Sequence, residues 1–520
     1  MMPATPATLI HHFLERGAAS SPDATAVVFE KERWTYAEID RRANRLAREL
    51  IGAGVRGGDR VVLISENRPE YVVAYYGILK TGGVSVALNP DLKPESLRSL
   101  LAELRPKSVL VSRRYGPLLG AAGAGGLGID DIRVLAPGLP DLSISSSGMG
   151  EDPGIPIDPG ACAMIVYTSG SSGRPKGVML SHANIVANTG SIIAYLELGP
   201  ADIQMVVLPF HYVMGQSLLN THIAVGGRVV INNKFGYTAA VLAQMARERV
   251  TGFSGVPSTY AHLLFKSPLA KYRDRLPSLR YCSQAGGHMS RQVKLELLRV
   301  LPPHTRLYVM YGATEASARL TYLPPESLRQ KIDSVGLPIP GVTMRVLSGS
   351  GEILEPGQIG ELVASGDNIM TGYYRDESAT KKVLDRHGYH TGDLGYMDQD
   401  GFLYVTGRKD DQLKVGGHRV DPREVEDVIM ESGRVVECIV FGIPDPLAGR
   451  RLAGLIVPVA GGPADGAEIV EFCRDKLPRF KVPEPLVAVE AIPKSSIGKP
   501  DRAESIGLFE RILSRGGGAE

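Results

Sequence analysis

The sequence predicts an α/β protein with a large N-terminal domain of layered, mostly parallel sheets and helices, a β-rich subdomain, and a small mobile α+β C-terminal domain. The layered part is predicted from about residue 25 to about residue 315. There, continuous apolar runs such as RVVLIS alternate with helical patterns such as PEYVVAYYGILKTG. Short apolar strands separated by helices are typical of parallel sheets that are covered on both faces.

The β-rich subdomain and the small domain are predicted from two later changes in pattern. Between about residues 340 and 420, alternating segments are separated by turn residues such as Asp400 and Gly401, which indicates β-hairpins. After about residue 420, short helix and strand patterns carry their own apolar set. The charged stretch GRKDDQ lies between them. We therefore expect a large domain over residues 1–407, a hinge over 408–411 and a small domain over 412–520.

Composition excludes several classes of protein. The 520 residues hold 58 Lys and Arg against 56 Asp and Glu, a net charge of +2, so no basic excess indicates a nucleic-acid partner. No apolar run reaches the ~18 residues of a membrane span, and the N-terminus lacks a signal-peptide pattern. The four cysteines are scattered, as in a reducing compartment. We expect a cytoplasmic protein without a membrane span, and we expect His11 and His12 on the surface of an N-terminal helix.

The stretch YTSGSSGRPKGVMLSH predicts a phosphate-binding loop after an apolar strand. Its glycines let backbone N–H groups form a concavity for anions, while its hydroxyls and Lys176 add donors and a positive charge. The alternative is a mobile surface loop of Gly and Ser. The loop is not a Walker motif, because Lys176 is followed by Gly177 and not by Ser or Thr. A second glycine motif, GAGGLG, has neither the preceding strand nor the following helix of a dinucleotide site, and we interpret it as a linker.

Five motifs together resemble the AMP-forming adenylating superfamily: acyl-CoA synthetases, luciferase-like enzymes and peptide-synthetase adenylation domains. The loop YTSGSSGRPKG is followed in family order by YGATE, YHTGDLG, GRKDDQLKVGGHRVDPREVE and PKSSIGKPDR. The resemblance covers almost the whole chain and is closest to acyl-CoA ligases. It implies ATP-dependent activation of a carboxylic acid to acyl-AMP with release of pyrophosphate, followed by transfer to a thiol. ATP, Mg²⁺ and CoA are the implied cofactors.

The resemblance also implies an ATP/AMP site built from several segments. Lys176, Thr314, Glu315 and Lys499 would be catalytic, and Glu315 would hold Mg²⁺ as a hard oxygen ligand. The binding residues implied are Thr168, Ser169, Gly170, Ser171, Ser172, Gly173 and Lys176 for the β- and γ-phosphates, Ala285, Gly286, Gly287 and Tyr311 for adenine, Gly312, Ala313 and Thr314 in the segment at the α-phosphate, and Asp393 and Arg408 for the ribose.

The implied mechanism depends on a lysine in the small domain. Lys499 would bridge the substrate carboxylate and the α-phosphate. Lys494 is the competing choice, but the pattern P-K-x-x-x-G-K-x-x-R favours Lys499. Asp410 matches the hinge about which the small domain turns between the two half-reactions. In the second pose, the thiol tunnel would be lined by Gly416, Gly417 and His418.

The acyl pocket is expected after the motif LPFHYVMGQS. His211 follows Phe210 where amino-acid-activating domains carry an Asp for the substrate ammonium, which argues against an α-amino acid. Gly312 stands where short-chain enzymes carry a Trp. We therefore expect room for a medium or long acyl chain or an aryl acid. His288 stands where acyl-CoA enzymes often have a small residue, so the sequence does not predict which residue forms the floor of the pocket. The expected lining is His211, Tyr212, Met214, Gly215, Val256 and Gly312.

Two alternatives share most of these residues. One is an acyl-AMP ligase that loads the phosphopantetheine of a free-standing acyl carrier protein, since no carrier domain follows the small domain. The other is an inactive nucleotide-binding relative. The second is opposed by the charged motif residues, which are all present: Lys176, Glu315, Asp393, Arg408 and Lys499.

Overall fold

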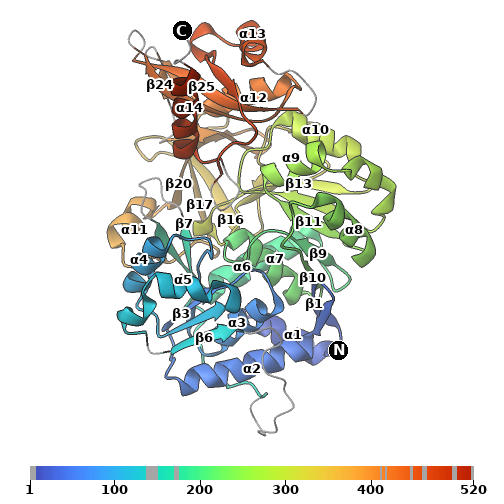
Figure 1. Cartoon of the computed structure of the whole chain (residues 1–520), viewed down its shortest axis with the longest axis vertical. Coiled ribbons are helices and arrows are strands. Elements are labelled where there is room, and N and C mark those ends of the chain that lie inside the picture. The colour runs from blue at the N-terminus through green and yellow to red at the C-terminus, as the bar shows by residue number, and fades with distance from the viewer. Residues whose placement is uncertain are drawn as a thin grey trace.

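The computed structural model describes residues 7–129, 131–135, 150–168, 175–409, 413–415, 418–445, 449–459, 465–494 and 500–516. Figure 1 shows a large part, coloured from blue to light orange, and a small C-terminal part in darker orange and red that lies at one end of it. The large part contains three sheets of seven, nine and five strands, and the small part contains one sheet of three strands and one of two. The α/β fold class predicted from the sequence is confirmed.

The seven-stranded sheet carries the start of the glycine-rich loop. Its strands follow the order β18–β8–β7–β4–β3–β5–β6, and those from β7 to β6 run parallel. The strands are β3 (Arg60–Ile64), β4 (Val84–Ala87), β5 (Ser108–Ser112), β6 (Asp131–Leu135), β7 (Cys162–Thr168), β8 (Lys176–Ser181) and β18 (Gly372–Tyr373). The glycine-rich loop therefore joins the antiparallel strands β7 and β8, and is not a direct strand-to-helix turn.

The nine-stranded sheet follows the order β15–β14–β13–β12–β11–β9–β10–β1–β2. Its central strands from β13 to β1 are parallel, as the alternating pattern predicts. The strands are β1 (Thr25–Phe29), β2 (Glu32–Thr35), β9 (Ile203–Val206), β10 (Arg228–Ile231), β11 (Gly252–Gly255), β12 (Tyr281–Gln284), β13 (Arg306–Tyr311), β14 (Thr321–Leu323) and β15 (Leu337–Pro338).

The core of the large part lies between these two sheets. All residues of α3 (Pro69–Lys80) are buried, and its apolar side chains belong to a cluster with residues of both sheets, such as Leu63 and Val229. A helix that is apolar all round can only be stable when it is covered on every side. By contrast, α2 (Tyr36–Gly52) buries one face and starts with a capping box between Thr35 and Glu38.

The remaining helices of the large part cover the sheets or join their strands. They are α1 (His12–Ser20), α4 (Pro94–Leu104), α5 (Gly116–Ala121), α6 (His182–Leu196), α7 (Val213–Ala224), α8 (Thr238–Glu248), α9 (Pro257–Lys266), α10 (Arg291–Val300) and α11 (Glu377–Val383). The motif GAGGLG forms a short 3₁₀ turn, Ala124–Leu127, between α5 and β6, which agrees with its interpretation as a linker. Over the described residues, no helix is long and apolar enough to cross a membrane.

The β-rich subdomain is a five-stranded antiparallel sheet, as the hairpin pattern predicts. Its strands are β16 (Val342–Leu347), β17 (Gly360–Gly366), β19 (Leu384–Asp385), β20 (Gly388–Met397) and β21 (Leu403–Arg408). In the register of β20 and β21, Asp393 lies opposite Arg408. The two motif residues assigned to ribose are thereby neighbours on adjacent strands.

Over the described residues, the small part combines two long strands, three short strands and three α-helices. It contains β22 (Leu413–Val415), β23 (His418–Val420), α12 (Pro422–Glu431), β24 (Val435–Asp445), β25 (Gly449–Pro458), α13 (Gly466–Lys476), β26 (Leu486–Ala488) and α14 (Arg502–Gly516). Figure 1 shows α12 beside α10 of the large part. The Nε2 atom of His288 lies 2.7 Å from Asp427 Oδ1 on α12. His288 therefore bonds to the small part, and the sequence-based link between His288 and the pocket floor is not supported.

Candidate nucleotide and acid site

The phosphate end of the site is built around Tyr373. Thr168 and Lys176 are opposite partners at the ends of β7 and β8. The Lys176 ammonium lies 5.0 Å from the centre of the Tyr373 ring, and the Tyr373 hydroxyl donates to Glu315 Oε1 at 2.8 Å. The structure thus brings a cation and a carboxylate from distant motifs to one tyrosine. The loop residues between the strands, Ser169, Gly170, Ser171, Ser172 and Gly173, lie outside the described residues.

The motif YGATE forms a tight reversal after β13. The N–H of Ala318 donates to the carbonyl of Ala313, and that of Leu320 donates to the carbonyl of Tyr311. Ala318 has a φ of 116°, a region that residues with a side chain rarely adopt. The reversal places Thr314 and Glu315 in a short 3₁₀ turn. The N–H of Met370, in the segment that leads to Tyr373, donates to the Glu315 carbonyl at 2.8 Å and ties the turn to the phosphate end.

Gly312 does not provide pocket volume in the direction of a side chain. A Cβ built there would lie 2.1 Å from the Ala318 carbonyl oxygen and 2.8 Å from Arg319 Cα. The backbone of Ala318 and Arg319 fills the space that a side chain at position 312 would occupy. Gly215 is similar, since a Cβ there would lie 2.0 Å from the carbonyl oxygen of Pro209. Both glycines allow close backbone packing, and the size of the acid expected from Gly312 stays a prediction.

The nucleoside end is a network of Tyr311, Asp393 and Arg408. The Tyr311 hydroxyl donates to Asp393 Oδ2 at 2.6 Å, and Arg408 Nε lies 3.3 Å from Asp393 Oδ1. Burial, followed by the nearby Asp393 charge, raises the pKa of Tyr311 well above its usual value, so its hydroxyl stays a donor. The carboxylate is held in place from two sides, and each of its oxygens keeps further capacity to accept a hydrogen bond.

The loop after β12 supplies backbone close to this network. Gly286 has a φ of 87°, and a Cβ there would lie 3.2 Å from Val256 Cγ1. The Gln284 side chain donates to the Gly287 carbonyl at 2.7 Å, while Ala285 is buried with Met310, the residue before Tyr311. A flat backbone surface without side chains is the kind of surface that an adenine ring can approach.

His211 and Met214 lie at the start of α7. Burial lowers the pKa of His211 to about 3, so the imidazole is neutral at neutral pH. Its Nε2 atom is buried without a hydrogen-bond partner among the described residues. Met214 packs against a cluster that includes Ala285 and Met310. Met214, which is assigned to the acid, is therefore a neighbour of Ala285, which is assigned to adenine.

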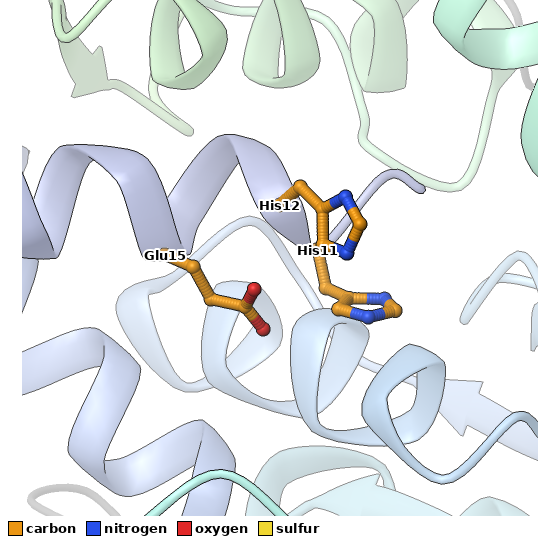
Figure 2. Close-up of side chains that lie close together, drawn as sticks. All are labelled: His11, His12 and Glu15. Atoms are coloured by element: carbon orange, nitrogen blue, oxygen red, sulfur yellow. The ribbon is translucent and has the colours of Figure 1, made fainter. Parts of the chain in front are cut away.

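A group of possible metal ligands lies far from this site in the sequence. Atoms of His11, His12 and Glu15 lie within 4.8 Å of one another, and Figure 2 shows them together at the start of α1. His11 is 5% exposed, so the expectation that this pair lies on the surface is wrong for His11. However, Lys80 Nζ lies 2.5 Å from Glu15 Oε1. An ammonium already neutralises this carboxylate, and we assign no metal to the group.

The small part contributes fewer described site residues. Lys499, Asp410, Gly416 and Gly417 lie outside the described residues. Lys494, the competing choice for the catalytic lysine, lies 3.0 Å from Glu437 of the same part. The His418 ring stacks on Phe480 with 4.2 Å between ring centres.

Two family models match the chain: AMP-binding enzyme over residues 14–374, and AMP-binding enzyme C-terminal domain over residues 424–499. The chain belongs to the AMP-binding enzyme family. A feruloyl-CoA synthase of Amycolatopsis sp is 34% identical over 486 residues, which cover 93% of this chain and 96% of the relative. A long-chain-fatty-acid–CoA ligase of Bacillus subtilis is 30% identical over 531 residues, covering 95% and 93%.

Solved structures of CoA ligases share the fold of this AMP-binding enzyme. ATP-bound MatB from Rhodopseudomonas palustris matches with a TM-score of 0.86 and 28% identity, over 96% of this chain and 99% of that one. The o-succinylbenzoate CoA synthetase MenE from Bacillus subtilis, in complex with its acyl-adenylate intermediate, matches with a TM-score of 0.81 and 26% identity, over 95% and 97%. Both matches span the large and the small part.

Sequence reasoning missed several residues that shape this AMP-binding site. Tyr373 links Lys176 to Glu315, and the Asn368 side chain donates to the carbonyls of Ala316 and Arg319 and thereby holds the reversal after YGATE. The segment DNIMTGYY, which contains Asn368 and Tyr373, carries no charge pattern of a phosphate site. Its pairing with β8 through β18 is visible only in three dimensions.

Proposed function

We propose that this AMP-binding enzyme converts a carboxylic acid of the acyl or aryl type, ATP and CoA into an acyl-CoA, AMP and pyrophosphate. The observation that carries the proposal is the convergence of two networks: Lys176, Tyr373 and Glu315 at one end, and Tyr311, Asp393 and Arg408 at the other. The YGATE turn is shared by both networks. The Lys176 ammonium suits the triphosphate, and the Glu315 carboxylate suits a metal ion. The Asp393 carboxylate, with Arg408 beside it, suits the ribose of the same nucleotide.

In the first step, a carboxylate oxygen of the acid attacks the α-phosphorus of ATP, and the bond from that phosphorus to the bridging oxygen of pyrophosphate breaks. Both reactants are anions, so the protein must neutralise charge and fix their geometry. Lys176 would bind the β- and γ-phosphates together with the hydroxyls and glycines of residues 168–173. Thr314 would donate to the α-phosphate. Glu315 would hold Mg²⁺, which offsets phosphate charge when bound.

The nucleoside would be held by the second network. Asp393 would accept hydrogen bonds from the ribose hydroxyls, with Arg408 beside it. Tyr311 would stack on adenine while its hydroxyl orients the carboxylate. The backbone of Ala285, Gly286 and Gly287 would face the other side of the ring. The contacts among Tyr311, Asp393 and Arg408 support these roles.

The small part would supply Lys499 in the first step and the thiol path in the second. Residues 408–411 would act as the hinge around Asp410, and Gly416, Gly417 and His418 would line the path of the thiol. In the second step, the sulfur attacks the acyl carbon and AMP leaves with the former carboxylate oxygen. The acid pocket would be lined by His211, Tyr212, Met214, Gly215 and Val256.

The test is an acid panel followed by a thiol panel. Purified protein is incubated with ATP, Mg²⁺ and aryl or aliphatic acids, and pyrophosphate and AMP are measured. CoA and a phosphopantetheine-bearing carrier protein are then offered in parallel. Acid-dependent pyrophosphate and acyl-CoA support the proposal. Thioester on the carrier alone would favour the acyl-AMP ligase. ADP formation, or no acid-dependent pyrophosphate, would contradict the proposal.

A further inference from the structure

Arg319 lies buried next to the turn formed by the motif YGATE. Only 2% of the residue is exposed, and its Cα is 2.8 Å from the position that a Gly312 Cβ would occupy. Its carbonyl accepts hydrogen bonds from the side chains of Asn188 and Asn368 at 3.0 and 2.9 Å. The backbone of Arg319 is therefore fixed between α6 and the segment before β18.

The guanidinium of Arg319 has few partners. It donates to the neighbouring Ala318 carbonyl at 3.2 Å and bonds to the hydroxyl of Tyr195. Its Nε–H is buried without a partner, and among the described residues no carboxylate acts on its charge; Tyr195 is the one titratable group that does. Buried arginines are normally paired with a carboxylate, because an unpaired charge in the interior is costly. Burial lowers the pKa of Arg319, but a guanidinium stays protonated in proteins.

Two polar side chains next to Arg319 also have oxygen atoms without a hydrogen bond. The side-chain oxygens of Asn188 and Asn368, whose amide nitrogens hold the Arg319 carbonyl, are both buried without a hydrogen bond among the described residues. Several unpaired buried polar atoms in one region are destabilising, and a bound polar ligand would give them hydrogen-bond partners.

The guanidinium is also close to the predicted acid pocket. Tyr195, its partner, donates to Met310 Sδ at 2.9 Å and stacks on Tyr322 with 4.4 Å between ring centres. The same cluster contains Ala285 of the predicted adenine surface and is contacted by Met214 of the predicted acid pocket. Through Tyr195, the guanidinium thus borders the cluster against which Met214 packs.

We propose that Arg319 binds a second carboxylate on the substrate, so that the preferred acid is a dicarboxylate of which one end is adenylated. This inference rests on the proposed function and narrows its substrate class. The guanidinium is covered in this structure, so the proposal requires the side chains around Arg319 to move apart when the acid binds. The unpaired N–H groups of the Arg319 guanidinium would then donate to the distal carboxylate.

The experiment compares matched acids and matched variants. Hexanoate is paired with adipate, octanoate with suberate, and benzoate with terephthalate, and kcat/KM for pyrophosphate release is measured for each acid. The variants are Arg319→Met, which keeps length without charge, and Arg319→Lys, which keeps the charge. The control is Arg345→Met, because Arg345 bonds to Ser365 and the His387 carbonyl in the β-rich subdomain. Thermal melting of each protein is followed in parallel.

We expect the wild type and Arg345→Met to prefer at least one diacid over its partner, and Arg319→Met to lose roughly 10²-fold or more on that diacid, since a site built to bind a polar group discriminates strongly when the pair is broken. Arg319→Lys should retain part of the preference. The melting temperature of Arg319→Met should stay level or rise, because an unpaired buried charge is removed.

Three results would overturn the inference. The first is a wild-type protein that prefers the monoacid in every pair. The second is an Arg319→Met variant whose ratio of kcat/KM between diacid and monoacid equals that of the wild type. A melting temperature that falls in Arg319→Met, with equal loss on both acids of each pair, would show a purely structural arginine. Each of these leaves the proposed function intact, whereas pyrophosphate release with no acid at all would refute the proposed function itself.

Discussion

Replacing Asp393 with asparagine should weaken ATP binding by roughly 10- to 150-fold, and the structure allows this size to be worked out. The Asp393 side chain is 15% exposed and accepts the Tyr311 hydroxyl at 2.6 Å. A hydrogen bond to a charged group contributes about 1.5–3 kcal/mol. The ion pair with Arg408 adds little, since the Arg408 side chain is 47% exposed and such pairs give about 0–1 kcal/mol.

The loss of ATP affinity is therefore expected mainly from weaker hydrogen bonds between the ribose hydroxyls and residue 393. Asparagine keeps the shape of the side chain and one acceptor oxygen, but it loses the charge and the second acceptor. Losing one charge-assisted hydrogen bond of about 1.5–3 kcal/mol corresponds to roughly 10- to 150-fold in affinity, because about 1.4 kcal/mol is tenfold.

Isothermal titration with α,β-methylene ATP measures this effect without turnover. The matched variant is Tyr311→Phe, which keeps the carboxylate and removes only the donor that orients it. Tyr311→Phe leaves the carboxylate free to accept from the ribose and weakens ATP binding only through poorer orientation of Asp393. A smaller loss of about 0.5–1.5 kcal/mol, roughly 2- to 12-fold in affinity, is therefore expected. Asp393→Asn binding within twofold of the wild type, or Tyr311→Phe losing more than Asp393→Asn, would refute the assignment of Asp393 to the ribose.

Three further predictions concern other parts of the molecule. Gly312→Ala should lower pyrophosphate release for every acid without shifting chain-length preference, since its Cβ meets the Ala318 carbonyl; a shift towards short acids in a chain-length series would contradict this. Lys499→Ala should abolish acid-dependent pyrophosphate exchange but spare thiolysis of a pre-made acyl-adenylate, and equal loss of both steps would remove its assigned role. Burial raises the pKa of Glu426 from 4.5 to about 7, so the folded chain holds this proton more tightly than the unfolded chain. Stability of the small part should then be full below about pH 4.5 and fall as the pH rises through 7, by on the order of 3 kcal/mol at most. Hydrogen exchange in β24, corrected for intrinsic rates, should show this slope in the wild type and not in Glu426→Gln; the same slope in both would exclude Glu426 as its source.

Much of the fold could be predicted because it depends on local pattern. The runs that became β3, β4 and β5 are continuous and apolar, and the intervening helices begin with proline, as in α3 and α4. The division into two main sheets was not predictable. It depends on which strands pair, and β1 pairs with β10 across about 200 residues of sequence.

The site shows the same division between what is local and what is not. Motif residues such as Glu315 and Asp393 carry their chemistry in the sequence, and the structure gives them partners. Tyr373 and Asn368 could not be found, because their roles come from contacts with segments remote in the chain. The surroundings of Gly312 could not be predicted for a related reason: a glycine in a motif can mean either open space or close backbone approach, and the sequence does not show that the Ala318 carbonyl lies next to it.

The central claim is that a carboxylate oxygen attacks the α-phosphorus of ATP. It is tested most directly by supplying an acid labelled with ¹⁸O in its carboxyl group, together with ATP and CoA, and recording the mass of the AMP released. One ¹⁸O atom should appear in each AMP, because thiolysis cleaves the acyl C–O bond and leaves the acid's oxygen on phosphorus. Label in inorganic phosphate with ADP as the nucleotide product, or AMP without label, would contradict the account.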